Sequence, residues 1–391
     1  MKILFDLQLS FVDKATNLFK VDSDSNFNFT KNAITGILNL DPTIEIGLIL
    51  PPSKMMYGSN YDLVSQMPAN VKYYRAPYHT DYLKSRFLFP YAEVIEIVDD
   101  FAPDVVWTND FARVEYYLLA KRDTSAAFKV VAYNHWIDNT IYPKVDSQYT
   151  YIYRQLEGAM QADLIMFNTL YGLKFFLNGL TASNLTPDGL RWQYTLALPP
   201  LLDCEAIRSM ASPVKFEEPS IIFNHRMSSL NYYSDNFQNF FQACESLQVE
   251  YPFKVYCTNP SGYNLELPEY MEGVSLEKYE DYINFISKCH IGVGFFLEGH
   301  GQWSMSLAEL AVLGIPFIIP NMFGYPSLVP PYYPYLFNSF SEGEECLREL
   351  LEVGATQEVR EELMAYADTH YSVKTGMKAF VKWIAEEIKE D

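Results

Sequence analysis

Residues 295–320 read FFLEGHGQWSMSLAELAVLGIPFIIP, and the rest of the chain fits around the structure that they predict. Its glycine-bearing loop leads into Ser304, where the pattern predicts a helix start, and the apolar residues of 307–313 suit a buried helix. Gly314 is typical of a helix C-terminus, and a short apolar strand follows it. Strand, loop, helix, glycine and strand together predict a βαβ unit.

The loop and helix start of this unit form a predicted anion site. The first N–H groups of a helix have no partner within the helix, and the helix dipole adds positive charge there. A diphosphate placed above Ser304, Met305 and Ser306 would meet both. Glu309 follows about a turn and a half further on, where its carboxylate can reach sugar hydroxyls. The sequence therefore predicts a binding site for a nucleotide sugar. Three polar residues of the preceding loop are candidates for contact with the sugar: Glu298, His300 and Gln302.

Length and composition predict two domains and exclude some classes of function. A chain of 391 residues is too long for one ordinary core. The formal net charge of −20 disfavours a protein that coats nucleic acid or an anionic membrane, because such proteins carry a basic surplus. Five cysteines without a CxxC pair predict free thiols in a reducing compartment. The opening MKILFDLQLSF suits a first strand better than a signal peptide, and no stretch reaches membrane-spanning length, so we expect a cytoplasmic protein.

The order of apolar runs predicts an α/β fold with two doubly wound parallel sheets. The strands expected in the first half are 2–7, 44–50, 71–75, 104–107, 129–133 and 162–167, and those in the second half are 220–223, 253–257, 291–296 and 315–319. Proline and charge accumulate over 198–218, where we place the linker. The expected domains are therefore 1–198 and 199–375, with 376–391 as a helix that crosses back to the first domain.

Two charged or titratable residues follow predicted strands directly, at the edge where open α/β sheets place their chemistry. Arg226 follows the strand 220–223, and its planar fork of donors suits the negative charge that builds on a departing diphosphate. His135 follows the strand 129–133, where it is a candidate for contact with the transferred sugar or the acceptor hydroxyl, or for a local structural role.

Glu309 requires a partner if it is buried. Burying an unpaired carboxylate costs several kcal/mol, so the side chain is either exposed or bound to a ligand or a protein group, and we favour a ligand. The segment Asp22-Ser23-Asp24 resembles an Asp-x-Asp metal clamp but lacks an apolar strand before it. We therefore expect no metal site.

The segment SMSLAELAVLGIPFIIP resembles the donor-site signature of retaining GT-B glycosyltransferases, with Glu309, Ala311, Gly314 and Pro316 at matching positions. ADLIMFNT and SIIFNHR resemble strands of the same family. The resemblance implies two Rossmann-like domains facing a cleft, with the acceptor bound by the first and the nucleotide sugar by the second. It also implies that Glu309 holds the ribose, that Arg226 and the amides of 304–306 hold the diphosphate, and that His135 lies near the sugar.

Two positions depart from the family pattern. Gly301 stands where the family often has a second glutamate, and Asn231 stands where it often has a lysine. Loss of that lysine weakens phosphate neutralisation unless another cation, for which we name Lys254, replaces it. These departures leave the stereochemistry open and keep a non-catalytic nucleotide-sugar-binding protein as an alternative.

The predicted function is metal-independent transfer of a hexose or pentose from a UDP-type nucleotide sugar to a hydroxyl acceptor, with no cofactor beyond the donor. The pattern NHR…NYY…NF, within 224–237, resembles bacteriophage enzymes that glycosylate hydroxymethylated pyrimidines in DNA. The acceptor is therefore a modified base in phage DNA, in which case the enzyme acts in the host cytoplasm, or else a saccharide or small molecule. The acidic balance speaks against the DNA acceptor.

Overall fold

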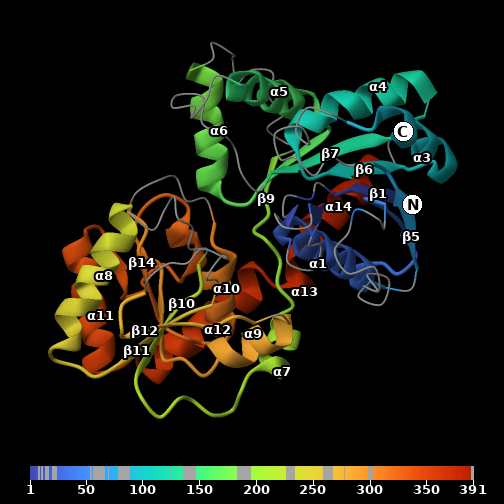
Figure 1. The fold of residues 1–391 in the computed structure, drawn as a ribbon. Helices are drawn as coiled ribbons and strands as arrows, with labels where there is room; N and C mark the ends of the chain where they lie inside the picture. The colour runs from blue at the N-terminus through green and yellow to red at the C-terminus, as the bar shows by residue number, and fades with distance from the viewer. Residues whose placement is uncertain are drawn as a thin grey trace. The chain divides into compact units, whose positions relative to one another are not determined.

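The computed structural model describes residues 1–7, 9, 12–13, 17–19, 24–52, 55, 67–68, 70–77, 89–124, 126–134, 147–182, 195–225, 234–258, 267–276, 278–297 and 303–388 (Figure 1). The chain divides into two compact units. Unit 1 comprises Met1–Leu201 and Val373–Asp391, and unit 2 comprises Leu202–Ser372. The boundaries expected from the sequence, after 198 and after 375, lie a few residues from these.

Unit 1 is built on a seven-stranded parallel sheet in the order β5-β4-β1-β6-β7-β8-β9. Its strands are β1 (Lys2–Asp6), β4 (Glu45–Leu50), β5 (Val71–Arg75), β6 (Val105–Thr108), β7 (Lys129–Asn134), β8 (Leu164–Phe167) and β9 (Thr195–Ala197). All but β9 are expected from apolar runs. A separate antiparallel pair joins β2 (Val12–Asp13) and β3 (Leu18–Phe19).

The helices of unit 1 are α1 (Ser25–Leu40), α3 (Tyr91–Phe101), η3 (Phe111–Arg113), α4 (Val114–Thr124), α5 (Ser147–Gln161), α6 (Leu170–Ala182), α13 (Val373–Gly376) and α14 (Lys378–Glu387). Asp24, the last residue of the Asp-Ser-Asp segment, is the N-cap of α1, and its carboxylate accepts from the amides of Asn26 and Phe27. This structural role accounts for Asp24. Asp22 and Ser23 lie outside the described residues.

The C-terminal helices belong to unit 1, and in Figure 1 the red α14 lies among its blue and teal elements. The ring of Phe380 packs edge-on against that of Trp107, with 4.8 Å between the ring centroids. Gly36 of α1 gives α13 room to approach, because a Cβ at this position would lie 2.8 Å from the carbonyl oxygen of Val373. The segment from Val373 onward thus completes the core of the unit that the N-terminus begins.

A buried ion pair lies at the carboxyl end of β1. Arg113 Nη1 donates to both carboxylate oxygens of Asp6, at 2.7 and 2.8 Å, and both side chains are almost fully buried. Next to it in the sheet, Asn109 follows β6 and is also buried. It accepts from Trp107 Nε1 and donates to Thr30 Oγ1. Each of these polar side chains at the sheet edge thus has a hydrogen-bond partner within the core.

Unit 2 is built on a six-stranded parallel sheet in the order β12-β11-β10-β13-β14-β15. Its strands are β10 (Ser220–Phe223), β11 (Lys254–Cys257), β12 (Met271–Gly273), β13 (Ile291–Val293), β14 (Phe317–Pro320) and β15 (Leu336–Phe337). Its helices are α7 (Cys204–Met210), α8 (Asp235–Gln248), α9 (Tyr279–Ile286), α10 (Met305–Val312), η6 (Tyr325–Leu328), α11 (Phe340–Glu352) and α12 (Gln357–His370).

The prediction that 198–218 is a linker is wrong in one respect, because α7 lies inside it. Asp203 is the N-cap of this helix and accepts from the amide of Ala206. This helix has only seven residues and lies between prolines, so its helical pattern was not recognised in the sequence. Within the described ranges, no helix has the length and apolar character needed to cross a bilayer.

The ion pair generates the first prediction. Arg113→Ala leaves the Asp6 carboxylate buried without its main cation, so we expect a loss of about 3–5 kcal/mol in the free energy of unfolding. Chemical denaturation measures it. The paired replacement Asp6→Leu with Arg113→Met removes both charges and should be less destabilised than Arg113→Ala. Equal losses in the two proteins would contradict a dominant role for the uncompensated charge.

Candidate functional site

The candidate site lies at the switch point of the unit 2 sheet. From β10 the chain proceeds to β11 and β12 on one side, and from β13 it proceeds to β14 and β15 on the other. Neighbouring strands β10 and β13 therefore send their connections to opposite sides, the arrangement at which open α/β sheets bind ligands beyond the carboxyl ends of their strands. Asn224 and His225 follow β10 directly, and α10 begins at Met305 after the loop that follows β13.

Helix α10 packs directly on β13 because Gly292 and Gly294 both lie on the face of the strand that meets the helix. A Cβ at Gly292 would lie 2.2 Å from Leu310 Cδ1, and one at Gly294 would lie 2.7 Å from Leu307 Cδ1. No side chain larger than hydrogen fits between the strand and these two leucines. The sequence IGVG at 291–294 thus fixes the height of α10 above the sheet.

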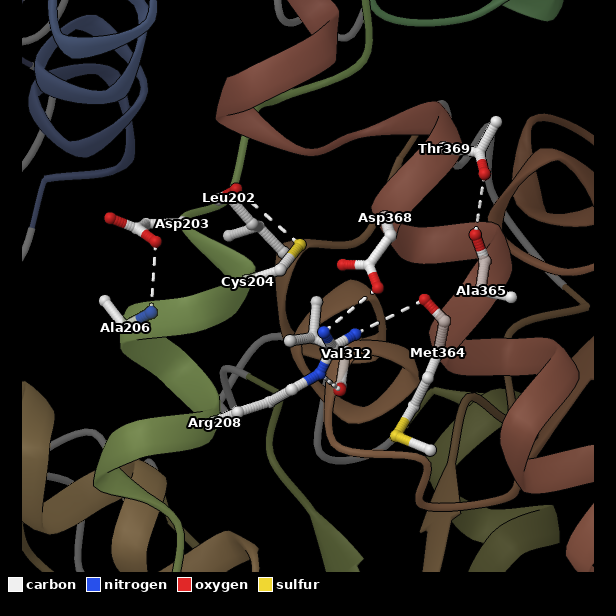
Figure 2. Close-up of polar contacts among 10 residues, drawn as sticks. All are labelled: Leu202, Asp203, Cys204, Ala206, Arg208, Val312, Met364, Ala365, Asp368 and Thr369. Atoms are coloured by element: carbon white, nitrogen blue, oxygen red, sulfur yellow. Dashed lines mark hydrogen bonds and ion pairs between the residues drawn. The ribbon is translucent and has the colours of Figure 1, made fainter. Parts of the chain in front are cut away.

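The C-terminal end of α10 is held by a residue from α7. Figure 2 shows Arg208 reaching from α7 to the last turn of α10 and to α12. Its Nε donates to the carbonyl oxygen of Val312 at 2.9 Å, and its Nη1 lies 3.0 Å from Asp368 Oδ2. A cation at a helix C-terminus also complements the helix dipole. Gly314, with φ of +64°, ends the helix as the sequence predicts.

The N-terminal end of α10 carries a chain of hydroxyl groups that leads to His225. Ser304 is the N-cap, and its Oγ accepts from the amide of Leu307. Ser304 Oγ and Ser306 Oγ lie 3.2 Å apart, and Ser306 Oγ lies 3.0 Å from His225 Nδ1. His225 Nε2 faces the carbonyl oxygen of Val293 at 2.8 Å. Since a carbonyl oxygen only accepts, Nε2 carries the proton and Nδ1 accepts from Ser306.

The series of groups from Ser304 to His225 carries no charge, and it accepts from neither of the first two amides of α10. Burial lowers the pKa of His225 to about 4, so its ring is uncharged at neutral pH. Ser304 occupies the Leu307 amide, but within the described part of the chain no group accepts from the amides of Met305 and Ser306. The start of α10 therefore presents unpaired N–H donors and the positive end of a helix dipole without a compensating carboxylate in the chain of contacts.

Glu309 lies on the same helix and is 6% exposed. Its Oε1 accepts from Tyr279 Oη and its Oε2 from Tyr282 Oη, both at 2.8 Å. The two tyrosines stand three positions apart on α9 and so project from one face of it. Burial raises the pKa of Glu309 to about 7, and the two phenol hydrogen bonds offset only part of that effect. The partner that a buried Glu309 requires is thus present in the protein.

Asn224 joins the two groups of contacts. Its Nδ2 donates to Tyr282 Oη at 2.9 Å and to the carbonyl oxygen of Ser306 at 3.0 Å. The second acceptor fixes the orientation of the amide, so Oδ1 points away from both. Asn224 is 7% exposed, and among the described residues no group donates to this buried Oδ1. One polar network thus extends from Glu309 through Asn224 to the start of α10.

The structure brings together four of the predicted site residues, all on one helix and its cap: Ser304, Met305, Ser306 and Glu309. The five others lie outside the described residues: His135, Arg226, Glu298, His300 and Gln302. Their roles, and the ribose-binding role of Glu309, stay predictions. Arg226 follows His225 directly in the chain.

The suggestion that Lys254 replaces the missing lysine is wrong. Lys254 is the first residue of β11 and pairs with Ser220, the first residue of β10, so it lies at the amino edge of the sheet. Its Nζ is 3.8 Å from Glu218 Oε2. The start of α10 is at the opposite edge. No site role was predicted for Tyr279 and Tyr282, whose local signal in the sequence is two tyrosines three residues apart.

The raised pKa of Glu309 generates a second prediction. The folded protein holds the Glu309 proton between pH 4.5 and about 7, whereas the unfolded chain has lost it. Stability therefore falls as pH rises through this window, by roughly 3 kcal/mol for a shift of this size. Glu309→Gln should remove that part of the decline. Urea unfolding of both proteins at several pH values measures the difference, and parallel profiles would contradict the raised pKa.

The glycine contacts generate a third prediction. Gly292→Ala places a methyl group against Leu310, and we expect a loss of about 1–3 kcal/mol in the free energy of unfolding, the usual cost of overpacking. Leu310→Ala removes the nearer of the two close contacts of that methyl group, at 2.2 Å, and leaves the one with Phe317 Cβ at 2.9 Å. The double variant should therefore lose less than the sum of the single losses when denaturation curves are compared in a double-mutant cycle. Strict additivity would show that the two residues do not meet.

Comparison with known proteins finds relatives by structure only. No family model matches the sequence, and no curated protein matches it. The structure of HepE from Anabaena in complex with UDP-glucose has a TM-score of 0.66 at 14% identity, covering 100% of both chains. Sucrose-phosphate synthase from Thermosynechococcus elongatus has a TM-score of 0.71 at 10% identity, covering 100% of this chain and 98% of that one. The lipopolysaccharide outer core galactosyltransferase WaaB has a TM-score of 0.62 at 13% identity, covering 99% and 100%.

These likenesses span the whole chain, including both parallel sheets. The expected fold class is therefore confirmed: the chain has the α/β fold of GT-B glycosyltransferases, with two Rossmann-like domains.

Proposed function

We propose that the protein transfers a sugar from a nucleoside diphosphate, of the UDP type, to a hydroxyl acceptor. The observation that carries the proposal is the start of α10, at the switch point of a parallel sheet, where the amides of Met305 and Ser306 have no acceptor among the described residues. This arrangement suits a diphosphate. In the proposal Glu309, farther along the same helix, accepts hydrogen bonds from the hydroxyls of the adjoining ribose.

The leaving diphosphate gains negative charge as the bond to the sugar breaks. In the proposal this charge is met by the free amides and by Arg226, which follows His225 and whose guanidinium stays protonated at working pH. Because burial lowers the pKa of His225 to about 4, this ring does not change its charge near neutral pH. His135 is assigned to the transferred sugar or the acceptor, and Glu298, His300 and Gln302 to the sugar.

The structural neighbours support a UDP-sugar donor. The HepE structures contain UDP-glucose, UDP, or UDP and glucose, and a trehalose-6-phosphate synthase structure from E. coli contains UDP-2-fluoro glucose. The similarity in fold over the whole chain, together with an anion site in unit 2, makes UDP-sugars the first donors to test.

For the acceptor, a saccharide hydroxyl is favoured over a hydroxymethylated pyrimidine in phage DNA. A net charge of −20 repels a polyanion, and a DNA-acting enzyme would need a basic surface to offset it. The neighbours' names also describe enzymes of carbohydrate synthesis. In this proposal unit 1 binds the acceptor and unit 2 binds the donor.

A thermal-shift screen across nucleotides and nucleotide sugars tests the donor. A ligand at a hundredfold excess over Kd raises the free energy of unfolding by about 2.7 kcal/mol. We expect UDP to shift the melting temperature far more than uridine, because uridine lacks the diphosphate. Equal shifts for both would overturn the assignment of the anion site at α10.

Release of UDP from UDP-sugars, with products identified by mass spectrometry, tests the transfer. We expect turnover with a saccharide acceptor in the presence of EDTA, and about a hundredfold or greater loss in Arg226→Ala, as for removal of one donor to a developing charge. Arg226→Lys keeps the charge without the fork and should lose less. Tight UDP-sugar binding without turnover for saccharide, small-molecule or hydroxymethylated DNA acceptors would favour a binding protein instead.

A further inference from the structure

Both oxygens of Glu309 are already occupied by phenol hydroxyls, and the two phenols differ in their surroundings. Tyr282 is half-buried, and its Oη both donates to Glu309 and accepts from Asn224. Burial raises its pKa well above the ordinary value of 10, so it remains a donor. Tyr282 is therefore held on two sides and belongs to the fixed network.

Tyr279 is held on one side only. It is the first residue of α9 and its side chain is 43% exposed. Among the described residues, its hydroxyl has one hydrogen-bond partner, Glu309 Oε1. Its ring lies beside that of Tyr282, with 5.9 Å between ring centroids. A rotation of this side chain would break one hydrogen bond among those of the described residues.

We propose that Tyr279 is a displaceable cap on Glu309, whose hydroxyl occupies the place that a ribose hydroxyl takes when the nucleotide binds. This inference rests on the proposed function and adds a competing hydrogen-bond donor within the same site. A ribose hydroxyl donates to a carboxylate as a phenol does, so one donor replaces another at Oε1. Tyr282 stays in place and keeps Oε2 satisfied throughout.

The cap has two physical consequences. In the empty protein it satisfies a carboxylate that is 6% exposed, which would otherwise be left buried with one partner fewer. On binding, the nucleotide must displace the phenol. Part of the free energy of the new ribose hydrogen bond is therefore offset by the loss of the existing one. A nucleotide without ribose hydroxyls cannot make this exchange and leaves Tyr279 where it is. The cap therefore lowers the affinity for ribose nucleotides and leaves the affinity for nucleotides without these hydroxyls unchanged.

The experiment uses the full chain and two probes, UDP and 2′,3′-dideoxy-UDP, titrated calorimetrically into the wild type, Tyr279→Phe and Tyr282→Phe. The two variants each remove one phenol hydroxyl from the same carboxylate and keep the ring. Circular dichroism and the melting temperature establish that each variant is folded.

The expected result has opposite signs for the two variants. Tyr279→Phe should bind UDP about threefold to tenfold more tightly, the value of one hydrogen bond that no longer competes. Its affinity for 2′,3′-dideoxy-UDP should stay unchanged within about twofold, because that probe never displaces the cap. Tyr282→Phe should bind both probes more weakly, since it disrupts the fixed network around Asn224.

Other results would overturn the inference. If Tyr279→Phe weakens UDP binding, Tyr279 contacts the nucleotide directly and is no competitor. If it changes the affinities for both probes by the same factor, its effect does not pass through the ribose hydroxyls. An unchanged UDP affinity, with tight binding to the wild type, would overturn the cap alone. Absence of UDP binding to the wild type would overturn the proposed function, and the cap with it.

Discussion

The close contact between α10 and β13 is the constraint on which the candidate site depends. Gly292 and Gly294 let Leu310 and Leu307 lie directly on the strand, so the helix cannot slide or rise without opening a void. Arg208 holds the other end through the carbonyl oxygen of Val312. A helix fixed at both ends places its first amides at a set position above the sheet. Preorganised donors of this kind need no rearrangement when an anion arrives.

The polar network around α10 solves a problem that this close packing creates. A helix this deeply buried brings its side chains away from water, and each polar group among them needs a partner. Ser306 finds one in His225, and Glu309 finds two on α9. The network accomplishes this with uncharged groups except at Glu309, which carries the only carboxylate among these contacts. The network therefore stabilises the site without adding positive side chains that would compensate a bound anion in advance.

Local signals in the sequence were enough for most of the fold. Apolar runs with clear boundaries predicted β5 and β10 to the residue, and Gly314 ends α10 as expected. Strands of two or three residues, β9, β12 and β15, carry too little periodicity to be recognised.

The contacts of the site were harder to predict, because they join residues far apart in sequence. Glu309 was expected to need a ligand, and its partners stand 30 and 27 positions earlier on another helix. The position of Lys254 was predicted wrongly, because the edge of the sheet at which this residue lies depends on the register of its strand with β10.

The discontinuity of unit 1 bears on how the chain acquires its structure during translation. Phe380, Trp383 and Ile384 belong to the same apolar core as β1 and β6, yet the ribosome makes them after all of Leu202–Ser372. Unit 2 is continuous, so its core can close while the nascent N-terminal half still lacks its last helices. Until these emerge, the parts of Trp107 and α1 that the C-terminal helices cover remain exposed, and exposed apolar surface of this kind is what chaperones bind. The order of synthesis thus differs from the order in which the two cores can be completed.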